Sequence, residues 1–281
     1  AHYKRPIFIT GIPGVGKSDV VAQACDEVGV PCWPVRLIQH DPVECSGLPD
    51  VDKKTGRARW VPFEELLPSD PDWSGCIFVD EVTQLDPTTQ KVLAGLLDKQ
   101  GVAGRRLPPL ARFIIAGNRV QDRAGASRML SIVQSRCKQV ELLFSLQDWQ
   151  EWAAQHDVHQ VVRSFADFKG GAFVSFDPAI DVNPLPRTWA GVSDELYLHG
   201  TVDDSWDPIL QTVVGSLIGP GMASEFMAFR AHYNMLHGVV DQVLDNPASC
   251  SVPTDPSVVH ALVGAVSERL RGMNGTLKDQ Q

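Results

Sequence analysis

The segment GIPGVGKS, residues 11 to 18, has the residue types and the spacing that a phosphate-binding loop needs. It fits the pattern G-x-x-x-x-G-K-[ST], and it stands between an apolar run and a helical pattern. Glycine is required there because backbone N–H groups must turn inward around phosphate oxygens, where a Cβ would block the turn or the approach. We therefore predict phosphate binding at Gly11, Ile12, Pro13, Gly14, Val15, Gly16, Lys17, Ser18 and Asp19.

The apolar run CIFVDEVTQ is a second candidate, because it ends in the adjacent carboxylates Asp80 and Glu81. Ser18 and Asp80 carry the oxygen ligands that Mg²⁺ prefers, and we predict that they hold this ion beside the phosphates. Glu81 is placed to orient and polarise an attacking water as a general base. A kinase has the same glycine loop but needs a base for its acceptor, so this acid pair favours hydrolysis. The predicted cofactors are therefore ATP and Mg²⁺, and the predicted activity is ATP hydrolysis.

The segment NRVQDRAGASRMLSIVQSRC, residues 118 to 137, combines an amide with four arginines. Asn118 follows an apolar run and should lie at the carboxyl edge of a sheet, where an amide can position the same water. Asp122 is the one carboxylate in this segment, although the chain has a formal net charge of -9. This excess of cations predicts an anionic partner. The arginines are Arg119, Arg123, Arg128 and Arg136.

A parallel sheet is needed to bring these groups together, and the first half of the chain has the required alternation of elements. Helical patterns begin near Lys17 and at Asp86, which is a predicted N-cap with Pro87 at the first helical position. Strands that alternate with helices predict a mostly parallel sheet that is covered on both faces. The predicted strands are residues 7–10, 35–38, 76–80, 111–117 and 138–143.

After about residue 144 the strand patterns give way to helical ones. A capping pattern at Ser145 begins the first helix, and residues 170–186 form an irregular connection. The fold class is therefore α/β, with a nucleotide-binding core in residues 1–143 and a smaller helical domain in residues 144–281. The further helices are predicted at 187–199, 208–218, 221–236 and 256–272.

Composition excludes several other classes. Of the 281 residues 43% are hydrophobic and 21% charged, as in globular proteins. The acidic balance argues against a nucleic-acid-coating surface, although basic segments remain at 52–59 and 104–106. No apolar run approaches the roughly 18 residues of a membrane span, and we expect a cytoplasmic protein with no membrane contact. The six cysteines show no metal-binding spacing and are expected to be reduced packing residues.

The motifs also carry a family resemblance. GIPGVGKS, FVDE with the helix after it, AGN, the arginine segment that ends in SRC, and LPRTW resemble the AAA+ ATPases, in order and in spacing. The MoxR-like branch is the most similar, because SGLPDVDKKTGRARWVPFEELLP looks like the region of that branch between the second strand and the acidic motif that corresponds to FVDE. The match covers roughly residues 5 to 200.

This resemblance implies an ATP-driven homo-oligomeric ring, usually a hexamer, with nucleotide between subunits. By position, Asn118 would be sensor 1 and Arg187 sensor 2, and the helical domain would be a lid. SRC resembles the arginine-finger box of clamp-loader ATPases, which points to Arg136 as the residue that reaches the neighbouring subunit's ATP. Arg123 and Arg128 are second choices for this role. Many MoxR-like relatives act with a partner that carries a von Willebrand A domain, so a protein partner is implied.

Two other functions stay open. The SRC box and the basic loops at 52–60 and 99–112 also fit a clamp- or helicase-loader-like ATPase that acts on nucleic acid. Both loops look like hairpins or insertions that line a central pore in the MoxR-like branch, and both can equally be exposed, solvated loops. A nucleotide-dependent binding switch is disfavoured because Glu81 is intact.

Overall fold

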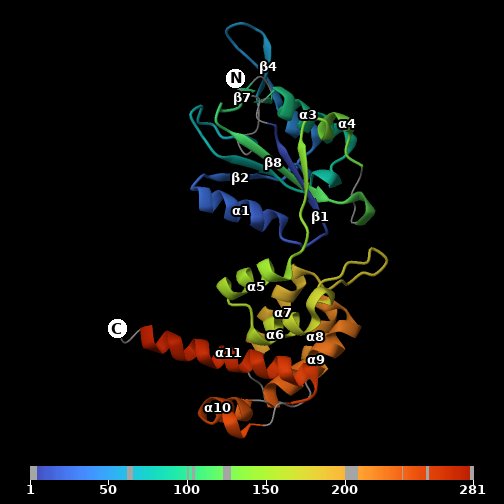
Figure 1. Cartoon of the computed structure of the whole chain (residues 1–281). Helices are drawn as coiled ribbons and strands as arrows, with labels where there is room; N and C mark the ends of the chain where they lie inside the picture. Colours follow the sequence, from blue (N-terminus) through green and yellow to red (C-terminus); the bar gives the residue numbers. More distant parts are fainter. Residues whose placement is uncertain are drawn as a thin grey trace. The chain divides into compact units, whose positions relative to one another are not determined.

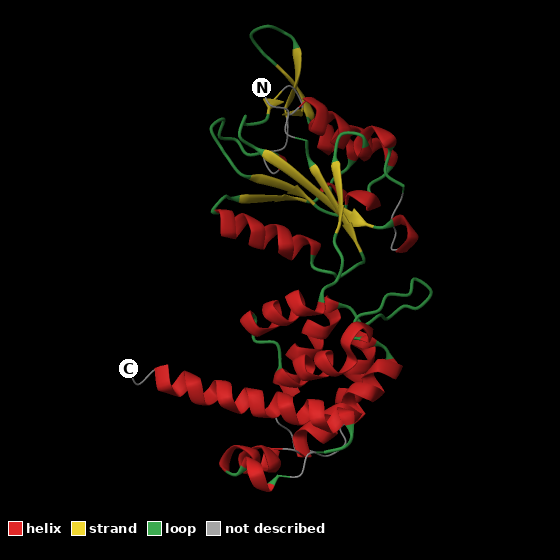
Figure 2. Ribbon diagram, viewed as in Figure 1, coloured by secondary structure: helices red, strands yellow, loops and turns green. Residues whose placement is uncertain are grey.

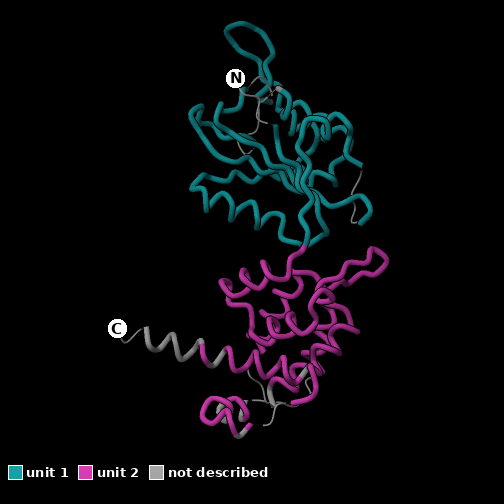
Figure 3. Tube along the Cα trace, in the orientation of Figure 1, with its two compact units in different colours: residues 1–143 teal, residues 144–281 magenta. Residues whose placement is uncertain are grey.

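A computed structural model describes residues 5–61, 66–99, 101–102, 105–122, 128–199, 208–235, 237–250 and 253–278. The chain divides into two compact units, unit 1 with Ala1–Leu143 and unit 2 with Phe144–Gln281 (Figure 3). Each unit has its own hydrophobic core.

Unit 1 is built on a five-stranded parallel sheet with strand order β2-β5-β8-β1-β9. Helix α1 lies on one face of the sheet, and α3 and α4 lie on the other (Figures 1 and 2). The strands are β1 (Ile7–Gly11), β2 (Cys32–Val35), β5 (Cys76–Val79), β8 (Arg112–Asn118) and β9 (Lys138–Glu141). The helices are α1 (Lys17–Val28), α2 (Pro42–Ser46), α3 (Pro87–Lys99) and α4 (Ser131–Gln134).

Strand β5 shows why the sheet is covered on both faces, since all four of its residues are buried. Cys76 and Phe78 pack with Val21 of α1, whereas Ile77 and Val79 pack into the core that contains the leucines of α3. Successive side chains of a strand point to opposite faces, so an unbroken apolar run needs a helix on each side. The predicted fold class, a P-loop α/β core followed by a helical region, is confirmed.

The predicted strand at 35–38 is wrong. The second strand comes three residues earlier, at Cys32–Val35, and Leu37–Gln39 forms a 3-10 helix. Pro34 lies inside this strand, and a proline has no N–H for the sheet. It is tolerated because β2 is an edge strand, where one side of the backbone needs no partner. The other four predicted strands are present, each within two residues of its predicted end.

Two hairpins project from unit 1. Strands β3 (Leu48–Val51) and β4 (Ala58–Val61) pair antiparallel, with Gly56 in a left-handed conformation in the turn. This confirms the hairpin predicted from residues 52–60. Strands β6 (Gly101–Val102) and β7 (Arg105–Arg106) form the second, shorter hairpin in the predicted insertion.

In the described part of unit 2, every regular element is a helix. Its core is aromatic: Trp189, fully buried, stacks on Phe173 at 4.5 Å and donates a hydrogen bond from Nε1 to the Phe173 carbonyl at 2.8 Å. The helices α6 and α10 were not predicted. The helices of unit 2 are α5 (Leu146–Gln155), α6 (Gln160–Lys169), α7 (Pro186–His199), α8 (Pro208–Ile218), α9 (Pro220–Met235), α10 (His237–Asp245) and α11 (Pro256–Lys278).

None of the helices within the described ranges combines the length and the apolar character of a membrane-spanning helix.

Candidate nucleotide site

The glycines of the loop between β1 and α1 are required for two different reasons. Gly16 has φ 98° and ψ 23° at the N-cap of α1, a left-handed backbone that an L side chain adopts only with strain. At Gly11 the limit is space, because an added Cβ would come within 2.8 Å of the Leu142 carbonyl oxygen. The predicted turn therefore applies at Gly16, whereas the limit at Gly11 is packing against the chain after β9, which was not predicted.

Lys17 joins the loop to the neighbouring strand. Its side chain is largely buried, and its Nζ donates hydrogen bonds to the carbonyls of Gly11 at 3.2 Å and Ile12 at 3.0 Å. Nζ also donates to Asn118 Oδ1 at 2.9 Å. Gly11 and Asn118 are register partners on β1 and β8, so the sheet itself brings Lys17 and Asn118, which are 101 positions apart, into contact.

Ser18 and Asp80 are in direct contact. Ser18 Oγ donates a hydrogen bond to Asp80 Oδ2 at 2.6 Å, and Asp80 Oδ1 accepts from the backbone N–H of Glu81 at 2.8 Å. Asp80 follows β5 directly, and its N–H donates to the Val35 carbonyl of β2 at 3.2 Å. A hydroxyl and a carboxylate that lie side by side can supply two oxygen ligands to a cation such as Mg²⁺.

Glu81 has an unusual backbone. Its φ of 57° and ψ of 28° lie in the left-handed region, and its side chain is exposed. Among the described non-glycine residues only Asp157 shares a positive φ, and aspartate tolerates that region better. A left-handed glutamate costs roughly 1 to 2 kcal/mol. Backbone strain of this kind is typical of functional positions, and Glu81 is the predicted general base.

Thr83 holds the backbone of Asn118, and no role was predicted for it. It is buried in the 3-10 helix after Glu81, and its Oγ1 accepts a hydrogen bond from the Asn118 N–H at 3.0 Å. A Cβ on Gly117 would come within 2.6 Å of the Thr83 methyl group. The threonine in DEVT, three residues after Asp80, was the available signal, but the sequence does not show that this turn packs against β8.

Gly117→Ala is expected to lower the free energy of unfolding by about 1 to 3 kcal/mol, because the new methyl group overpacks the contact with Thr83. Denaturant unfolding followed by tryptophan fluorescence measures this. Gly95→Ala is the matched control, since nothing lies within 4 Å of its added Cβ in the interior of α3. The control should be neutral or stabilising by up to about 1 kcal/mol. Equal losses in both variants would contradict the packing explanation.

Arg119 has internal partners. Its guanidinium pairs with Asp122 at 2.8 Å and with Glu141 at 3.0 Å, and the Asp122 side chain is only 3% exposed. The hydrogen bonds to Asp122 raise the pKa of Arg119. This arginine therefore ties the end of β8 to β9 within unit 1.

The other arginines differ in their surroundings. Arg136 pairs through Nη2 with Asp98 Oδ2 at 3.2 Å and donates from Nη1 to the Ile132 carbonyl at 2.5 Å. Arg128 is exposed and makes no hydrogen bond or ion pair with the described part of unit 1. Arg123 lies outside the described residues. In unit 2, Arg187 is exposed in the first turn of α7.

The structure thus brings Lys17, Ser18, Asp80 and Asn118 together at the carboxyl edge of the sheet, with Glu81 next in the chain. Asp19 is exposed in the first turn of α1, next to this group in sequence. The fold and the loop define a P-loop α/β architecture.

A scan against known protein families and a search of curated proteins find no match to the chain. Solved structures do match. NtrX from Brucella abortus is 15% identical with a TM-score of 0.44, and the match covers 94% of this chain and 64% of the NtrX chain. NtrX has also been solved in complex with ATP and with ADP.

A second match is the RuvB Holliday junction branch migration motor of Thermotoga maritima. It is 12% identical with a TM-score of 0.43, over 93% of this chain and 80% of that one.

Proposed function

We propose that this protein is an ATP-hydrolysing AAA+ ATPase of MoxR-like type, which uses the ATP cycle to remodel or activate a protein partner. One observation carries the proposal: the contacts Lys17–Asn118 and Ser18–Asp80 unite both predicted motifs and the predicted sensor at one sheet edge. The three segments are far apart in the sequence, yet the fold places a cation, a hydroxyl, an acid and an amide side by side. A nucleotide-phosphate site explains this combination.

In this proposal Lys17 contacts the β- and γ-phosphates, and the N-terminal end of α1 faces them with its free N–H groups. The hydrogen bonds from Lys17 to the loop carbonyls and to Asn118 hold its ammonium group in position before nucleotide binds. Ser18 and Asp80 hold Mg²⁺, which when bound neutralises charge on the phosphates.

Glu81 acts on the attacking water in this proposal. Glu81 is exposed, follows the proposed Mg²⁺ ligand Asp80 by one residue, and has a left-handed backbone. The carboxylate accepts a hydrogen bond from the water and then its proton, while the Asn118 amide orients the same water. Strain of this kind is retained where the conformation is required for the chemistry.

A ring of subunits completes the proposed site. Arg136 is the proposed trans-acting finger, and Arg187 of unit 2 the proposed sensor 2. Arg136 is held by Asp98, whose side chain is 52% exposed, and an ion pair that open to water is worth at most about 1 kcal/mol. Arg136 can therefore exchange Asp98 for a nucleotide phosphate. Arg128, exposed and unengaged by the described residues, is the alternative finger.

The proposed partner is a protein, in keeping with the MoxR-like resemblance, and a von Willebrand A domain is the first candidate. A nucleic-acid loader is the second candidate function, because the tip of the β3–β4 hairpin presents the exposed cations Lys53, Lys54 and Arg57. Acidic groups partly neutralise this hairpin, since Arg59 already pairs with Asp50 at 2.8 Å. We therefore place the protein partner first. Salt-dependent DNA or RNA binding that stimulates hydrolysis would reverse this order.

Lys17→Ala is the direct test of the site. The variant is expected to bind ATP roughly 10- to 100-fold more weakly, because each hydrogen bond to a charged group contributes about 1.5 to 3 kcal/mol. Isothermal titration with ATP and Mg²⁺ measures the affinity, and hydrolysis should fall with it. Lys91→Ala removes an exposed lysine of α3 as a control. Equal ATP affinity in the wild type and Lys17→Ala would exclude the proposed phosphate site.

A further inference from the structure

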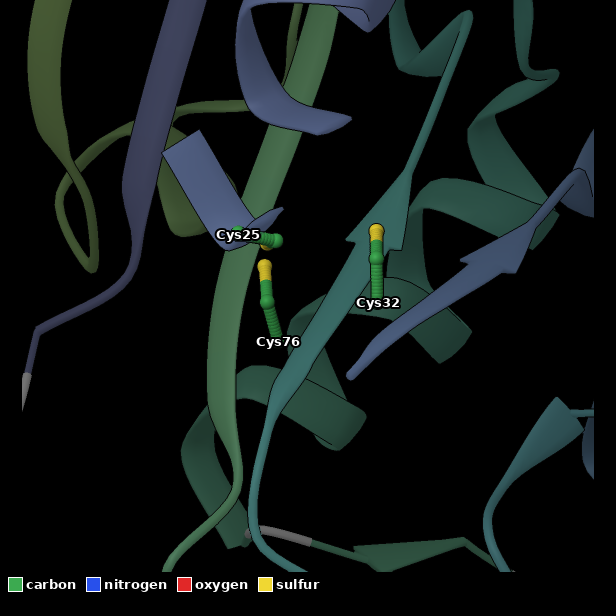
Figure 4. A group of neighbouring side chains, drawn as sticks. All are labelled: Cys25, Cys32 and Cys76. Atoms are coloured by element: carbon green, nitrogen blue, oxygen red, sulfur yellow. The ribbon is translucent and has the colours of Figure 1, made fainter. Parts of the chain in front are cut away.

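Three of the six cysteines meet between α1 and the sheet. The Sγ atoms of Cys25, Cys32 and Cys76 all lie within 4.8 Å of one another (Figure 4). Cys25 and Cys76 are buried, and Cys32 is partly exposed. The sequence separations hide this cluster, because the cysteines are 7 and 44 residues apart and form no short motif.

The fold explains why the thiols converge. Cys32 and Cys76 begin β2 and β5 and are register partners in this parallel pair, so their side chains share one face of the sheet. Cys25 lies in the last turns of α1, the helix that covers that face. Figure 4 shows Cys25 and Cys76 with their sulfur atoms toward one another and Cys32 beside them.

The spacing suits a thiolate-bound metal ion. Three sulfurs bound tetrahedrally to Zn²⁺ at about 2.3 Å are about 3.8 Å apart. The Sγ atoms lie within 4.8 Å of one another, so metal binding needs each Sγ–Sγ distance to shorten by at most about 1 Å. Small side-chain rotations supply this change. Within the described ranges no other His, Cys, Asp or Glu joins the group. The fourth position is therefore left to water, on the side of the partly exposed Cys32.

The ligand type selects the ion. Soft thiolates favour Zn²⁺ or Cu⁺ over the hard Mg²⁺, so this cluster does not compete for the ion proposed at Ser18 and Asp80. Of the two soft ions, Zn²⁺ leaves less charge in an apolar surrounding. Three thiolates give a net charge of about -1 with Zn²⁺ and about -2 with Cu⁺, and buried charge is disfavoured.

We propose that Cys25, Cys32 and Cys76 bind one Zn²⁺ ion that fastens the C-terminal end of α1 to the beginnings of β2 and β5. Binding converts three thiols to thiolates and releases three protons to solvent; no electron is transferred. The ion ties together the two elements that carry the nucleotide motifs at their other ends, since Lys17 begins α1 and Asp80 follows β5. Cys25 is eight residues from Lys17, about 12 Å along the helix.

Metal titration of the whole chain tests this proposal without nucleotide. The protein is reduced, stripped with a chelator, freed of the chelator, and titrated anaerobically with Cd²⁺ as a spectroscopic substitute and with Zn²⁺. We expect one equivalent to bind, with the ultraviolet sulfur-to-metal charge-transfer band of a three-thiolate site. One equivalent of Zn²⁺ should also raise the thermal unfolding midpoint, because the ion binds the folded state preferentially.

Cys32→Ala is the decisive variant, because its partly exposed side chain is the least needed for packing. It should lose the charge-transfer band, and its metal affinity should fall by more than the roughly 10- to 100-fold that loss of an outer-shell partner causes. Cys45→Ala is the matched control: Cys45 is buried in the same unit but lies outside the cluster. It should bind like the wild type. The unfolding midpoint without metal shows whether each variant folds.

Three results would overturn the proposal. One is the absence of stoichiometric metal binding by the folded wild type. Another is equal metal affinity in Cys32→Ala and Cys45→Ala. The third is a wild type that binds no metal when reduced and loses two hydrogens in mass on mild oxidation, because the cluster would then be a disulfide pair with a third thiol.

Discussion

Glu81→Gln is expected to lower kcat for ATP hydrolysis by roughly 10² to 10⁴-fold, the usual contribution of a general base, while ATP still binds. The physical reason is that the amide keeps the length and backbone of the glutamate but cannot accept the proton of the attacking water. Lys17, Ser18 and Asp80 are untouched, so the phosphate and Mg²⁺ contacts remain. Steady-state hydrolysis measures the rate, and titration with ATP measures the affinity.

Glu81→Asn separates the chemistry from the strain. Asparagine also lacks the carboxylate, so hydrolysis should be lost as in Glu81→Gln. It adopts the left-handed backbone more readily than glutamate, so the free energy of unfolding should rise by up to about 1 kcal/mol. A variant that is more stable and inactive would show that the strained backbone at φ 57° is kept for function. Hydrolysis at the wild-type rate in both variants would remove Glu81 from the mechanism.

Arg136→Ala is expected to lower the hydrolysis rate by roughly 10³ to 10⁵-fold if the arginine reaches the neighbouring subunit's ATP, as such fingers do in other NTPases. Asp98→Ala is the matched control, because it breaks the same ion pair from the other side. It should leave hydrolysis intact, since it frees the guanidinium instead of removing it. Parallel hydrolysis assays compare the two variants.

Mixed assemblies give the second half of this test. Rings of Arg136→Ala and Lys17→Ala should recover part of the activity, because some interfaces then combine an intact phosphate loop with an intact finger. Equal, small effects of Arg136→Ala and Asp98→Ala would instead show that Arg136 serves only its ion pair with Asp98. Arg128→Ala would then be the next variant, because Arg128 is exposed and has no partner among the described residues.

The four arginines show what a count of charges along the sequence can and cannot predict. Their density among residues 118 to 137 predicted an anionic partner, and for two of them the anions found are carboxylates of unit 1. Glu141 and Asp98 come from β9 and α3, outside the counted segment, and their proximity depends on strand order and helix packing. A sequence window shows which charges are close along the chain, not which are close in space.

The sequence by itself determined the P-loop, the acidic pair after a buried strand, the amide at the next strand end, and most helix and strand positions. These follow from local chemistry: glycine at left-handed positions, apolar runs for strands buried on both faces, and proline and caps at helix starts. Helices α2, α4, α6 and α10 and the position of β2 escaped these signals. For β2 the reason is its edge location, which tolerates Pro34 and is a property of the sheet.

Only the tertiary structure decided which side chains meet. The register of β1 and β8 places Lys17 against the Asn118 side chain, and the packing of the turn after Glu81 brings Thr83 to the backbone N–H of the same residue. The register of β2 and β5 aligns two thiols, which α1 covers with a third. Apart from Cys25 and Cys32, these contacts join residues tens of positions apart, and they arise when strands pair and a helix covers the sheet. Local residue preferences do not encode them, because pairing order and register depend on the whole core.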